Sequence, residues 1–282
     1  MKTMTLPGGE HAVLALHGLL GNPLEMQYLG KKLQSAGYTV HIPLIEGYGF
    51  AAGTGSGASY RTADCESWYA EVVRQFEQLK RTHVSVSVTG LCIGAVLALR
   101  LAIDRGDEVA ALSLLATTLA YDGWSLPWYR FLLPLAYYTP LRHLYSYQER
   151  APYGIKNNNL QRWIAREMAV TGSSAAGAAR LSAEGIFQAH RLIRQVRKQL
   201  ALVHTPALII HAQEDDVAST RSADFVDSHI SSAIRRKLIL QDSYHIITLD
   251  NEKEIVANET IDFFNRQLLP AAMPSPYSEA IA

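Results

Sequence analysis

The pentapeptide Gly90-Leu91-Cys92-Ile93-Gly94 carries the side chain of this sequence that is best suited to covalent chemistry. It follows an apolar run and precedes a helical pattern, the setting in which a strained strand-to-helix turn presents a nucleophile above a sheet. Glycines suit such a turn because the strand and the helix approach each other closely there. Cys92 is therefore the candidate nucleophile, beside a helix start that stabilises negative charge. The alternative is a small core residue in an ordinary turn, since free cysteines are often buried.

Two further side chains lie where an acyl-transfer site needs an orienting acid and a base. Asp215 and His245 each follow a short apolar run late in the chain. Carboxyl ends of parallel strands meet at one edge of a sheet, so both are expected beside Cys92. Asp216 competes with Asp215 for the role of the acid, and Asp250 is expected to cap the last helix. The other histidines are interpreted as structural or surface residues.

An acyl-transfer site also needs hydrogen-bond donors for the oxyanion of its tetrahedral intermediate. The expected pair is the backbone N–H of Ile93, directly after the nucleophile, and that of Leu19 in the turn formed by residues 17–23. This turn directly follows a buried run, so a purely structural role for its glycines is the weaker interpretation. No cluster of metal ligands stands out, and neither a metal nor an organic cofactor is expected.

Alternating strand and helix patterns predict an α/β protein with a mostly parallel sheet covered on both faces. The predicted strands are 12–16, 38–42, 84–88, 109–115, 207–210 and 237–240, and the predicted helices are 24–36, 64–81, 95–104, 219–229 and 251–266. From about residue 121 to residue 200 the chain becomes helical, aromatic and basic. We therefore expect a core of residues 1–120 and 201–269, a helical cap of 121–200, and a flexible tail of 270–282.

The composition is that of an ordinary globular chain. Its 282 residues include 26 Lys and Arg against 26 Asp and Glu, and 48% are hydrophobic. The balanced charge argues against binding nucleic acid by bulk phosphate neutralisation. No stretch predicts a signal peptide or a transmembrane segment, so the expected location is the cytoplasm. Two cysteines make no disulfide framework, and Cys65 is expected on a surface helix without a role.

Taken together, these stretches resemble the α/β hydrolase superfamily, close to its bacterial carboxylesterase and monoacylglycerol lipase branch, over nearly the whole chain. The stretches that carry the resemblance are 17–22, 47–49, 90–94, 213–216 and 244–250. The resemblance implies the α/β hydrolase fold, with Cys92, Asp215 and His245 at the positions of a catalytic triad. It also implies that Leu19 and Ile93 supply the oxyanion donors and that the insertion is a cap over an acyl pocket. Most of that branch has Ser where this chain has Cys92.

The predicted cap is positively charged, with 11 Lys and Arg against four Asp and Glu. The rest of the chain has an equal excess of negative charge, so we expect charge to be distributed unevenly over the molecule. Arg191, Arg194 and Lys198 recur at helical spacing and share one face. Such a face attracts an anionic partner, and the candidates are an acyl carrier protein, coenzyme A and an anionic membrane surface. A solvated face without a partner is the alternative.

These features predict a hydrolase of carboxylic esters or thioesters that works through a covalent acyl-thioester on Cys92. The acyl group is expected in an apolar slot, for which Trp124, Trp128 and Phe131 are the candidates. A first alternative is an acyltransferase that passes the acyl group from a coenzyme A or carrier-protein thioester to an alcohol or amine. A second is a protein that binds acyl ligands without turnover, against which the complete set of candidate residues argues.

Overall fold

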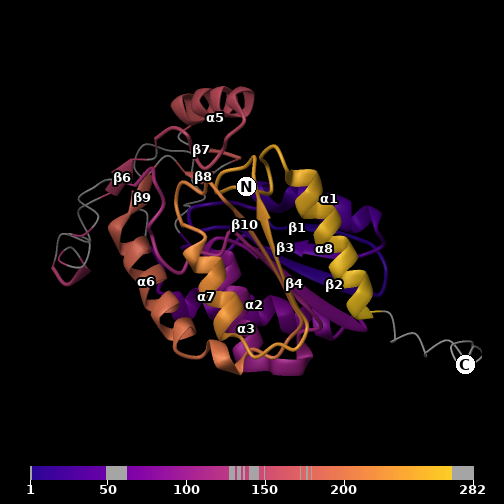
Figure 1. Ribbon diagram of the computed structural model, residues 1–282. Helices are drawn as coiled ribbons and strands as arrows, with labels where there is room; N and C mark the ends of the chain where they lie inside the picture. The colour runs from indigo at the N-terminus through magenta and orange to yellow at the C-terminus, as the bar shows by residue number, and fades with distance from the viewer. Residues whose placement is uncertain are drawn as a thin grey trace, which may run out of the picture.

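The centre of the protein is a seven-stranded sheet, seen in the computed structural model of Figure 1. The structure describes residues 2–48, 62–126, 131, 135, 137–139, 146–148, 150–171, 173–175, 177–178 and 180–268. The strands of the sheet are β1 (Met4–Leu6), β2 (His11–Leu16), β3 (Thr39–Ile42), β4 (Ser85–Leu91), β5 (Leu112–Leu115), β10 (Ala207–Ala212) and β11 (Arg235–Leu240). All but the short β1 were predicted from their apolar runs.

The order of the strands is β1-β3-β2-β4-β5-β10-β11. Within this sheet β1 pairs antiparallel with β3, and the other pairs are parallel. The register sets Leu16 opposite Gly90, and Leu91 opposite Leu115. The carboxyl ends of β2, β4 and β5 therefore meet at one edge, which is where Cys92 leaves the sheet.

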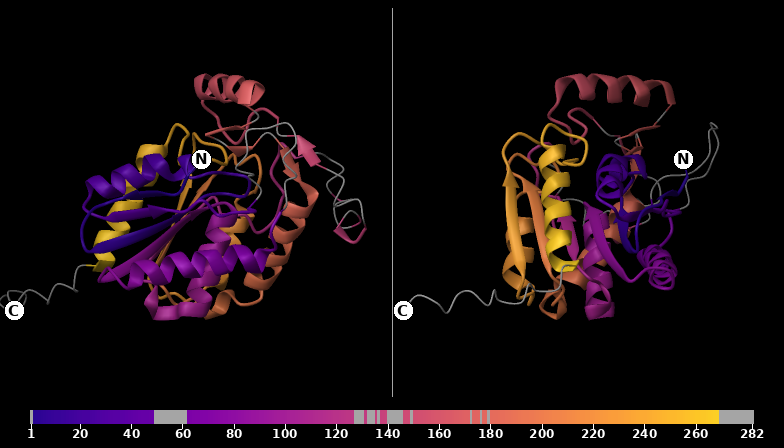
Figure 2. Two further views of the ribbon diagram at one scale, coloured as in Figure 1. Left: turned by 180° about the vertical axis from the view of Figure 1, so that it is seen from behind. Right: turned by 90° about the vertical axis from the view of Figure 1, so that its right-hand side faces the viewer.

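Helices cover both faces of the sheet, as the further views in Figure 2 show. The helices are α1 (Leu24–Ser35), α2 (Cys65–Lys80), α3 (Ile93–Arg105), α6 (Ala183–Arg197), α7 (Arg221–His229) and α8 (Lys253–Leu268). Leu14 and Leu16 of β2 belong to the core shared with α2, α3, α6 and α7. Val13 and Ala15 belong to the core shared with α1 and α8. The alternation along β2 thus divides the apolar interior into two layers.

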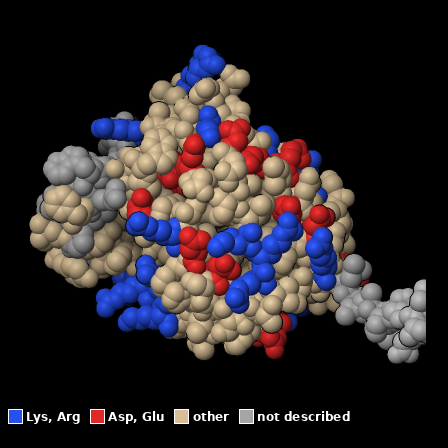
Figure 3. Space-filling view, in the orientation of Figure 1, with Lys and Arg blue, Asp and Glu red and all other residues tan. Residues whose placement is uncertain are grey.

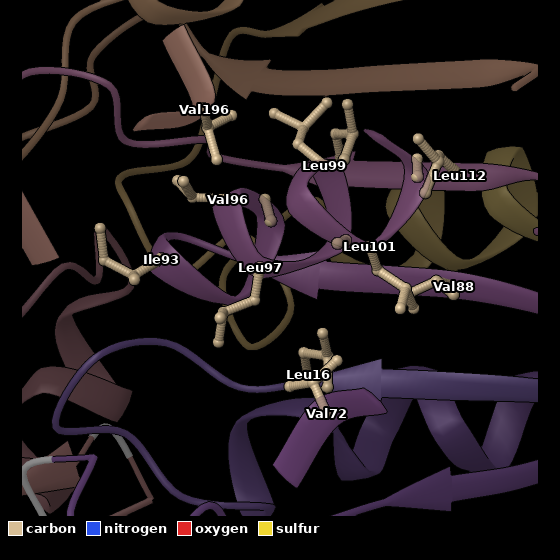
Figure 4. Close-up of a cluster of buried hydrophobic side chains, with 14 of the residues drawn as sticks. Leu16, Val72, Val88, Ile93, Val96, Leu97, Leu99, Leu101, Leu112 and Val196 are labelled. Atoms are coloured by element: carbon tan, nitrogen blue, oxygen red, sulfur yellow. The ribbon is translucent and has the colours of Figure 1, made fainter. Parts of the chain in front are cut away.

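Helix α3, which begins directly after Cys92, is buried on nearly all sides. Figure 4 shows Leu97 pointing towards Leu16 and Val72, and Val96 pointing towards Val196 of α6. Full burial of such a side chain contributes about 1.5–3 kcal/mol, so the packing holds the start of α3 firmly in place. Although α3 is this apolar, neither it nor any other helix in the described ranges is long and apolar enough to cross a membrane.

Between β5 and β10 the chain leaves the sheet and forms small elements of its own. These are the pair β6 (Ser146–Gln148) and β9 (Arg180–Ser182), the pair β7 (Ser173–Ser174) and β8 (Gly177–Ala178), and the helix α5 (Asn158–Thr171). In Figure 1, α5 stands above the carboxyl edge of the sheet. Helix α6 instead packs on α2 and α3 and shares their core. The domain boundaries at 120 and 201 stay a prediction.

Cys65 begins α2, as the sequence predicts, but its side chain faces inward. It is 1% exposed and packs in the core beside Trp68 and Val72. Burial raises the pKa of its thiol. The predicted helix at Cys65 is present, and the structure adds that this position of the helix faces the sheet rather than the solvent.

Candidate active site

Cys92 lies in the turn between β4 and α3 with a left-handed backbone, φ 58° and ψ −118°. Such a conformation costs a non-glycine residue about 1–3 kcal/mol and persists only where the surroundings hold it. The flanking glycines have no room for a side chain. A Cβ on Gly90 would lie 2.3 Å from the oxygen of Gly94, and one on Gly94 would lie 2.5 Å from the oxygen of His17. The turn therefore has the strained geometry that the pentapeptide predicts.

His245 and Asp215 form a buried pair on the loops after β11 and β10. Nδ1–H of His245 donates to the Asp215 carboxylate, with distances of 2.8 Å to Oδ2 and 3.0 Å to Oδ1. The same carboxylate accepts the backbone N–H groups of Val217 and Ala218, each at 2.8 Å. Asp215 thus fixes the ring so that Nε2 is the free nitrogen. Nε2 is buried and has no hydrogen-bond partner among the described residues.

The pKa values of this pair show which charges dominate. Burial alone would lower the pKa of His245, but its electrostatic interactions with Asp215 and Cys92 outweigh burial and raise that pKa well above its usual value. Burial alone would raise the pKa of Asp215, but the charge and hydrogen bond of His245 lower it. The structure therefore brings Cys92, His245 and Asp215 into one electrostatic unit.

Asp216, the competing acid, bonds a different part of His245. Its Oδ1 accepts the backbone N–H of His245 at 3.3 Å, and burial raises the pKa of its carboxyl. His211 of β10 supplies a second contact to the acid, with Nε2 3.3 Å from Oδ2 of Asp215 and 2.8 Å from the oxygen of Ala218. This contact was not predicted from the sequence, although the four-residue spacing of His211 and Asp215 across the strand end was a possible signal.

Buried side chains hold the backbone at the predicted oxyanion donors. Nδ1–H of His17 donates to the oxygen of Gly18 at 2.9 Å, and burial lowers the pKa of His17 to about 4, so the ring is neutral. The peptide after Gly18 is trans and planar, so fixing its C=O also fixes the direction of the Leu19 N–H. Ile93 is the first residue of α3. Neither amide, Leu19 nor Ile93, donates to another residue in the described ranges.

Glu25, in the first turn of α1, lies beneath the same backbone turn. Its Oε2 accepts the Gly18 N–H at 2.9 Å, and a Cβ on Gly21 would lie 2.2 Å from that oxygen. Burial raises the pKa of Glu25 to about 8, so its carboxyl is mostly neutral at pH 7. The sequence did not reveal this role, because an acidic residue in a first helical turn is ordinary.

Three hydroxyl groups near Cys92 were not singled out from the sequence. Oγ1 of Thr118 lies 3.4 Å from the Cys92 sulfur. The hydroxyls of Tyr48 and Tyr121 are buried and have no partner among the described residues. Burial, and then the charge of Cys92, raise the pKa of both tyrosines well above the usual value. Thr118 follows the carboxyl end of β5, so the strand-end reasoning that found Asp215 could have found it.

The residues predicted to line an acyl slot are only partly described. Trp124 is 58% exposed, its Nε1–H donates to the oxygen of Glu214 at 2.9 Å, and its ring meets that of Tyr244 edge-on at 5.3 Å. It therefore braces the two loops that carry Asp215 and His245. Phe131 is 65% exposed. Trp128 lies outside the described residues, and a substrate contact for all three stays a prediction.

The strained turn after β4 and the acid–histidine pair after β10 and β11, on a mostly parallel sheet, define the α/β hydrolase class of enzymes. Residues 9–253 match the hydrolase family described as serine aminopeptidase, S33, and the chain belongs to that family. The family's name refers to a serine, whereas this chain has Cys92 in the turn after β4.

Individual relatives agree with this assignment. A carboxylesterase of Bacillus subtilis (strain 168) is 25% identical over 271 residues, which are 94% of this chain and 96% of the relative. A thermostable monoacylglycerol lipase of Bacillus sp. (strain H-257) is 29% identical over 256 residues, 91% of each chain. The chain is thus a hydrolase related to carboxylesterases and monoacylglycerol lipases, and the predicted resemblance is confirmed.

Solved structures share the fold. A structure reported with the metagenome-derived lipolytic enzymes LipS and LipT has a TM-score of 0.77 at 22% identity and covers 94% of this chain and 97% of its own. The monoacylglycerol lipase of Paleococcus ferrophilus has a TM-score of 0.75 at 14% identity and covers 94% and 98%. The predicted α/β hydrolase fold is confirmed.

Proposed function

We propose that this protein hydrolyses carboxylic esters or thioesters through an acyl-thioester on Cys92. The observation that carries the proposal is the 2.8 Å hydrogen bond from His245 to Asp215, which leaves a buried Nε2 coupled electrostatically to Cys92. A base held in this way is what a cysteine nucleophile requires. The carboxylesterase and the monoacylglycerol lipase among the relatives support ester substrates.

In the first half of the reaction, the Sγ proton of Cys92 passes to Nε2 of His245. The sulfur then attacks the acyl carbon, and the electron pair of the carbonyl bond moves onto its oxygen. The N–H groups of Leu19 and Ile93 stabilise that oxyanion. When the carbonyl re-forms, the bond to the alcohol or thiol breaks, and His245 donates its proton to this leaving group. The acyl group stays on the sulfur.

In the second half, His245 removes a proton from a water molecule, and the resulting hydroxide attacks the thioester carbonyl. The second tetrahedral intermediate expels the Cys92 thiolate and releases the acid, and the sulfur recovers its proton from His245. Asp215 orients the ring and stabilises its positive charge in both halves. The buried hydroxyls of Tyr48 and Tyr121, which have no partner among the described residues, are candidates for bonding polar groups of the substrate.

A thioester on an anionic carrier is the second substrate class within this proposal. Arg191, Arg194 and Lys198 of α6 and the following turn are exposed, and none of them forms an ion pair within the described ranges. Figure 3 shows Lys and Arg side chains gathered at the lower left, over α6. This face complements the phosphates of coenzyme A or an acidic acyl carrier protein.

An intact-mass time course with 4-nitrophenyl hexanoate tests the proposed function. We expect one hexanoyl adduct on the unmodified protein, which clears in water while many acids are released per protein. Cys92→Ala removes both the adduct and the turnover. Cys65→Ala is the matched control and keeps both, because Cys65, at the start of α2, is buried in the core.

Other results would contradict the proposed hydrolysis in different ways. An adduct that persists until an alcohol or amine is added would identify an acyltransferase. Saturable binding that survives Cys92→Ala, without turnover on any acyl donor, would identify a ligand-binding protein. Undiminished turnover in Cys92→Ala would exclude Cys92 as the nucleophile.

A further inference from the structure

We propose that Thr118 is a further catalytic residue, whose hydroxyl donates a hydrogen bond to the Cys92 sulfur whenever that sulfur carries negative charge. The inference rests on the proposed function, because it concerns the nucleophile of the same site. It assigns to Thr118 the task of stabilising the thiolate, and above all the thiolate that leaves when the acyl-enzyme is hydrolysed.

The hydroxyl of Thr118 has two acceptors within reach. Oγ1 lies 3.4 Å from Sγ of Cys92 and 3.3 Å from the backbone oxygen of Ala116. A hydroxyl has one proton, so it serves one of these acceptors at a time. The side chain of Thr118 is 0% exposed, so bulk water does not compete for the sulfur from this side.

The backbone on both sides keeps Thr118 beside the nucleophile. The N–H of Cys92 donates to the oxygen of Leu115 at 2.9 Å, which ties the turn to the end of β5. Ala116 then adopts a left-handed conformation, φ 42°, and its N–H donates to the oxygen of Ile210 at 2.8 Å. The N–H of Leu119 donates to Oγ of Ser222 at 3.2 Å. Thr118 is therefore held between two fixed points.

Which of the two acceptors receives the hydrogen bond from Thr118 depends on the charge of the sulfur. A neutral thiol accepts hydrogen bonds weakly, so the proton of Thr118 rests on Ala116 before the reaction. A thiolate is an ionised acceptor, and hydrogen bonds to ionised groups are roughly twice as strong as neutral ones. Ionisation of Cys92 therefore turns the hydroxyl from Ala116 to the sulfur, and no other atom has to move.

This preference acts unequally on the two halves of the reaction. During acylation the sulfur loses negative charge as its bond to carbon forms, so a donor to the sulfur does not favour that step. During deacylation the carbon–sulfur bond breaks and its electron pair returns to the sulfur. The hydroxyl of Thr118 meets this growing charge, so it lowers the barrier to expelling the thiolate. We therefore expect Thr118 to serve chiefly the release of the acyl group.

The test compares Thr118→Val, which keeps the shape and removes the hydroxyl, with Thr118→Ser, which keeps the hydroxyl. Thr117→Val is the matched control, since Oγ1 of Thr117 is buried and has no hydrogen-bond partner among the described residues. If the valine at 118 prevents folding, Thr118→Ala replaces it. Two quantities are measured in each full-length variant. Both distinguish a specific effect on Cys92 from a loss of folding.

The first quantity is the rate at which iodoacetamide alkylates Cys92 between pH 5 and pH 10, followed by mass. Among the described residues, His245, Tyr48 and Tyr121 interact electrostatically with Cys92, and Glu25 interacts with His245 and Tyr48; all four are kept in every variant. In Thr118→Val we expect the midpoint of the alkylation curve to rise by about one pH unit, a tenfold loss of thiolate below it. Thr118→Ser and Thr117→Val keep the original midpoint.

The second quantity is the ratio of acylation to deacylation rate constants with 4-nitrophenyl hexanoate. In Thr118→Val we expect deacylation to slow about tenfold while acylation changes less, so the hexanoyl adduct accumulates. An unchanged midpoint and an unchanged ratio would overturn the proposal, and so would equal effects of Thr117→Val. A raised midpoint with no acyl adduct in any variant would instead support the hydrogen bond and overturn the hydrolase function.

Discussion

Burial determines the charge of the titratable side chains around Cys92 except where a partner outweighs it. His17 has a pKa of about 4 and Glu25 a pKa of about 8, and both are neutral at pH 7 for the same reason. His245 and Asp215 are equally buried, yet their mutual charge shifts both pKa values towards the ionised forms. The buried charge of the site is therefore concentrated on the hydrogen-bonded pair of His245 and Asp215, beside Cys92.

Glu25 makes the stability of this protein depend on pH in a direction that can be measured. Its pKa is raised from 4.5 to about 8 by burial, so the folded state keeps a proton that the unfolded state releases between those values. The free energy of unfolding therefore falls as the pH rises through this window. Glu25→Gln keeps an oxygen for the Gly18 N–H but does not titrate. From pH 5.5 to pH 8 we expect the native protein to lose at least about 1.4 kcal/mol relative to Glu25→Gln.

Urea unfolding at the two pH values gives both free energies. Glu46→Gln is the control, because Glu46 is an exposed carboxylate on the loop that follows β3. That variant should keep the pH dependence of the native protein. Parallel pH profiles for Glu25→Gln and the native protein would show that Glu25 is already ionised at low pH.

At the level of single residues, the sequence predicted which loops carry the site but not every contact within it. Cys92, Asp215 and His245 were found because each follows the carboxyl end of a parallel strand that is visible in the sequence as an apolar run. The choice between Asp215 and Asp216 needed coordinates, since adjacent positions in a loop point in unrelated directions. Thr118 escaped notice because a threonine after a strand has no distinctive pattern, and only its 3.4 Å distance to the sulfur marks it.

At the level of elements, the long buried segments were predictable and the short ones were not. The strands β2, β3, β4, β5, β10 and β11 were visible as apolar runs, and α1, α2, α3, α7 and α8 as helical patterns. By contrast, β1 has three residues, and β7 and β8 have two each. Such segments are strands only because a neighbour pairs with them, and pairing between distant segments leaves no periodic pattern in the sequence.

The loop that carries His245 is held by Asp250, and not in the way the sequence suggested. Asp250 was expected to cap α8, which begins at Lys253; its carboxylate accepts the N–H of Asn251 before that helix and also joins two loops. Oδ2 accepts the N–H groups of Lys156 and Tyr244 at 2.7 and 2.8 Å, and Oδ1 accepts that of Asn157 at 3.0 Å. One buried carboxylate thus fastens the loop of His245 to the segment before α5.

Replacing Asp250 by Asn is expected to destabilise the fold. The carboxylate is 1% exposed, and an amide offers one oxygen and one NH₂ group in place of two acceptor oxygens. At least one backbone N–H then loses its acceptor and faces another donor, so we expect unfolding to become easier by about 2–4 kcal/mol in urea titrations. Asp242→Asn is the control, because that side chain is 62% exposed, and it should cost less than about 1 kcal/mol. Equal losses of unfolding free energy in the two variants would show that the hydrogen bonds of Asp250 stabilise the fold no more than an exposed carboxylate does.

At the scale of the whole molecule, a zero net charge hides an uneven distribution of charge. Along β11 the basic side chains are balanced, since Arg235, Arg236 and Lys237 pair with acidic residues of α7 and α8. Along α6 the exposed Arg191 and Arg194 form no such ion pair among the described residues, and the charge of Arg191 acts only from a distance on Asp64. Lys and Arg side chains therefore gather over α6 (Figure 3), although the molecule as a whole is neutral.

This uneven distribution of charge predicts how salt acts on different substrates. Unpaired charges attract an anionic substrate from a distance, and the attraction is screened within about 8 Å at 0.15 M salt. We expect kcat/KM for hexanoyl-coenzyme A to fall about fivefold between 20 and 200 mM NaCl, while that for neutral 4-nitrophenyl hexanoate stays constant. Replacing Arg191, Arg194 and Lys198 together by Gln should lower the low-salt value for the coenzyme A thioester and flatten its salt dependence.

The charge-matched control replaces Arg235, Arg236 and Lys237 by Gln, which removes the same number of positive charges from the balanced strand β11. If net charge alone governed association, both triple variants would lose the salt dependence equally, and the α6 face would have no particular role. If only the α6 variant loses the salt dependence, the positive charges that attract the substrate are those on α6. A thioester on an anionic carrier then approaches the protein over α6, and neutral esters reach Cys92 without that help.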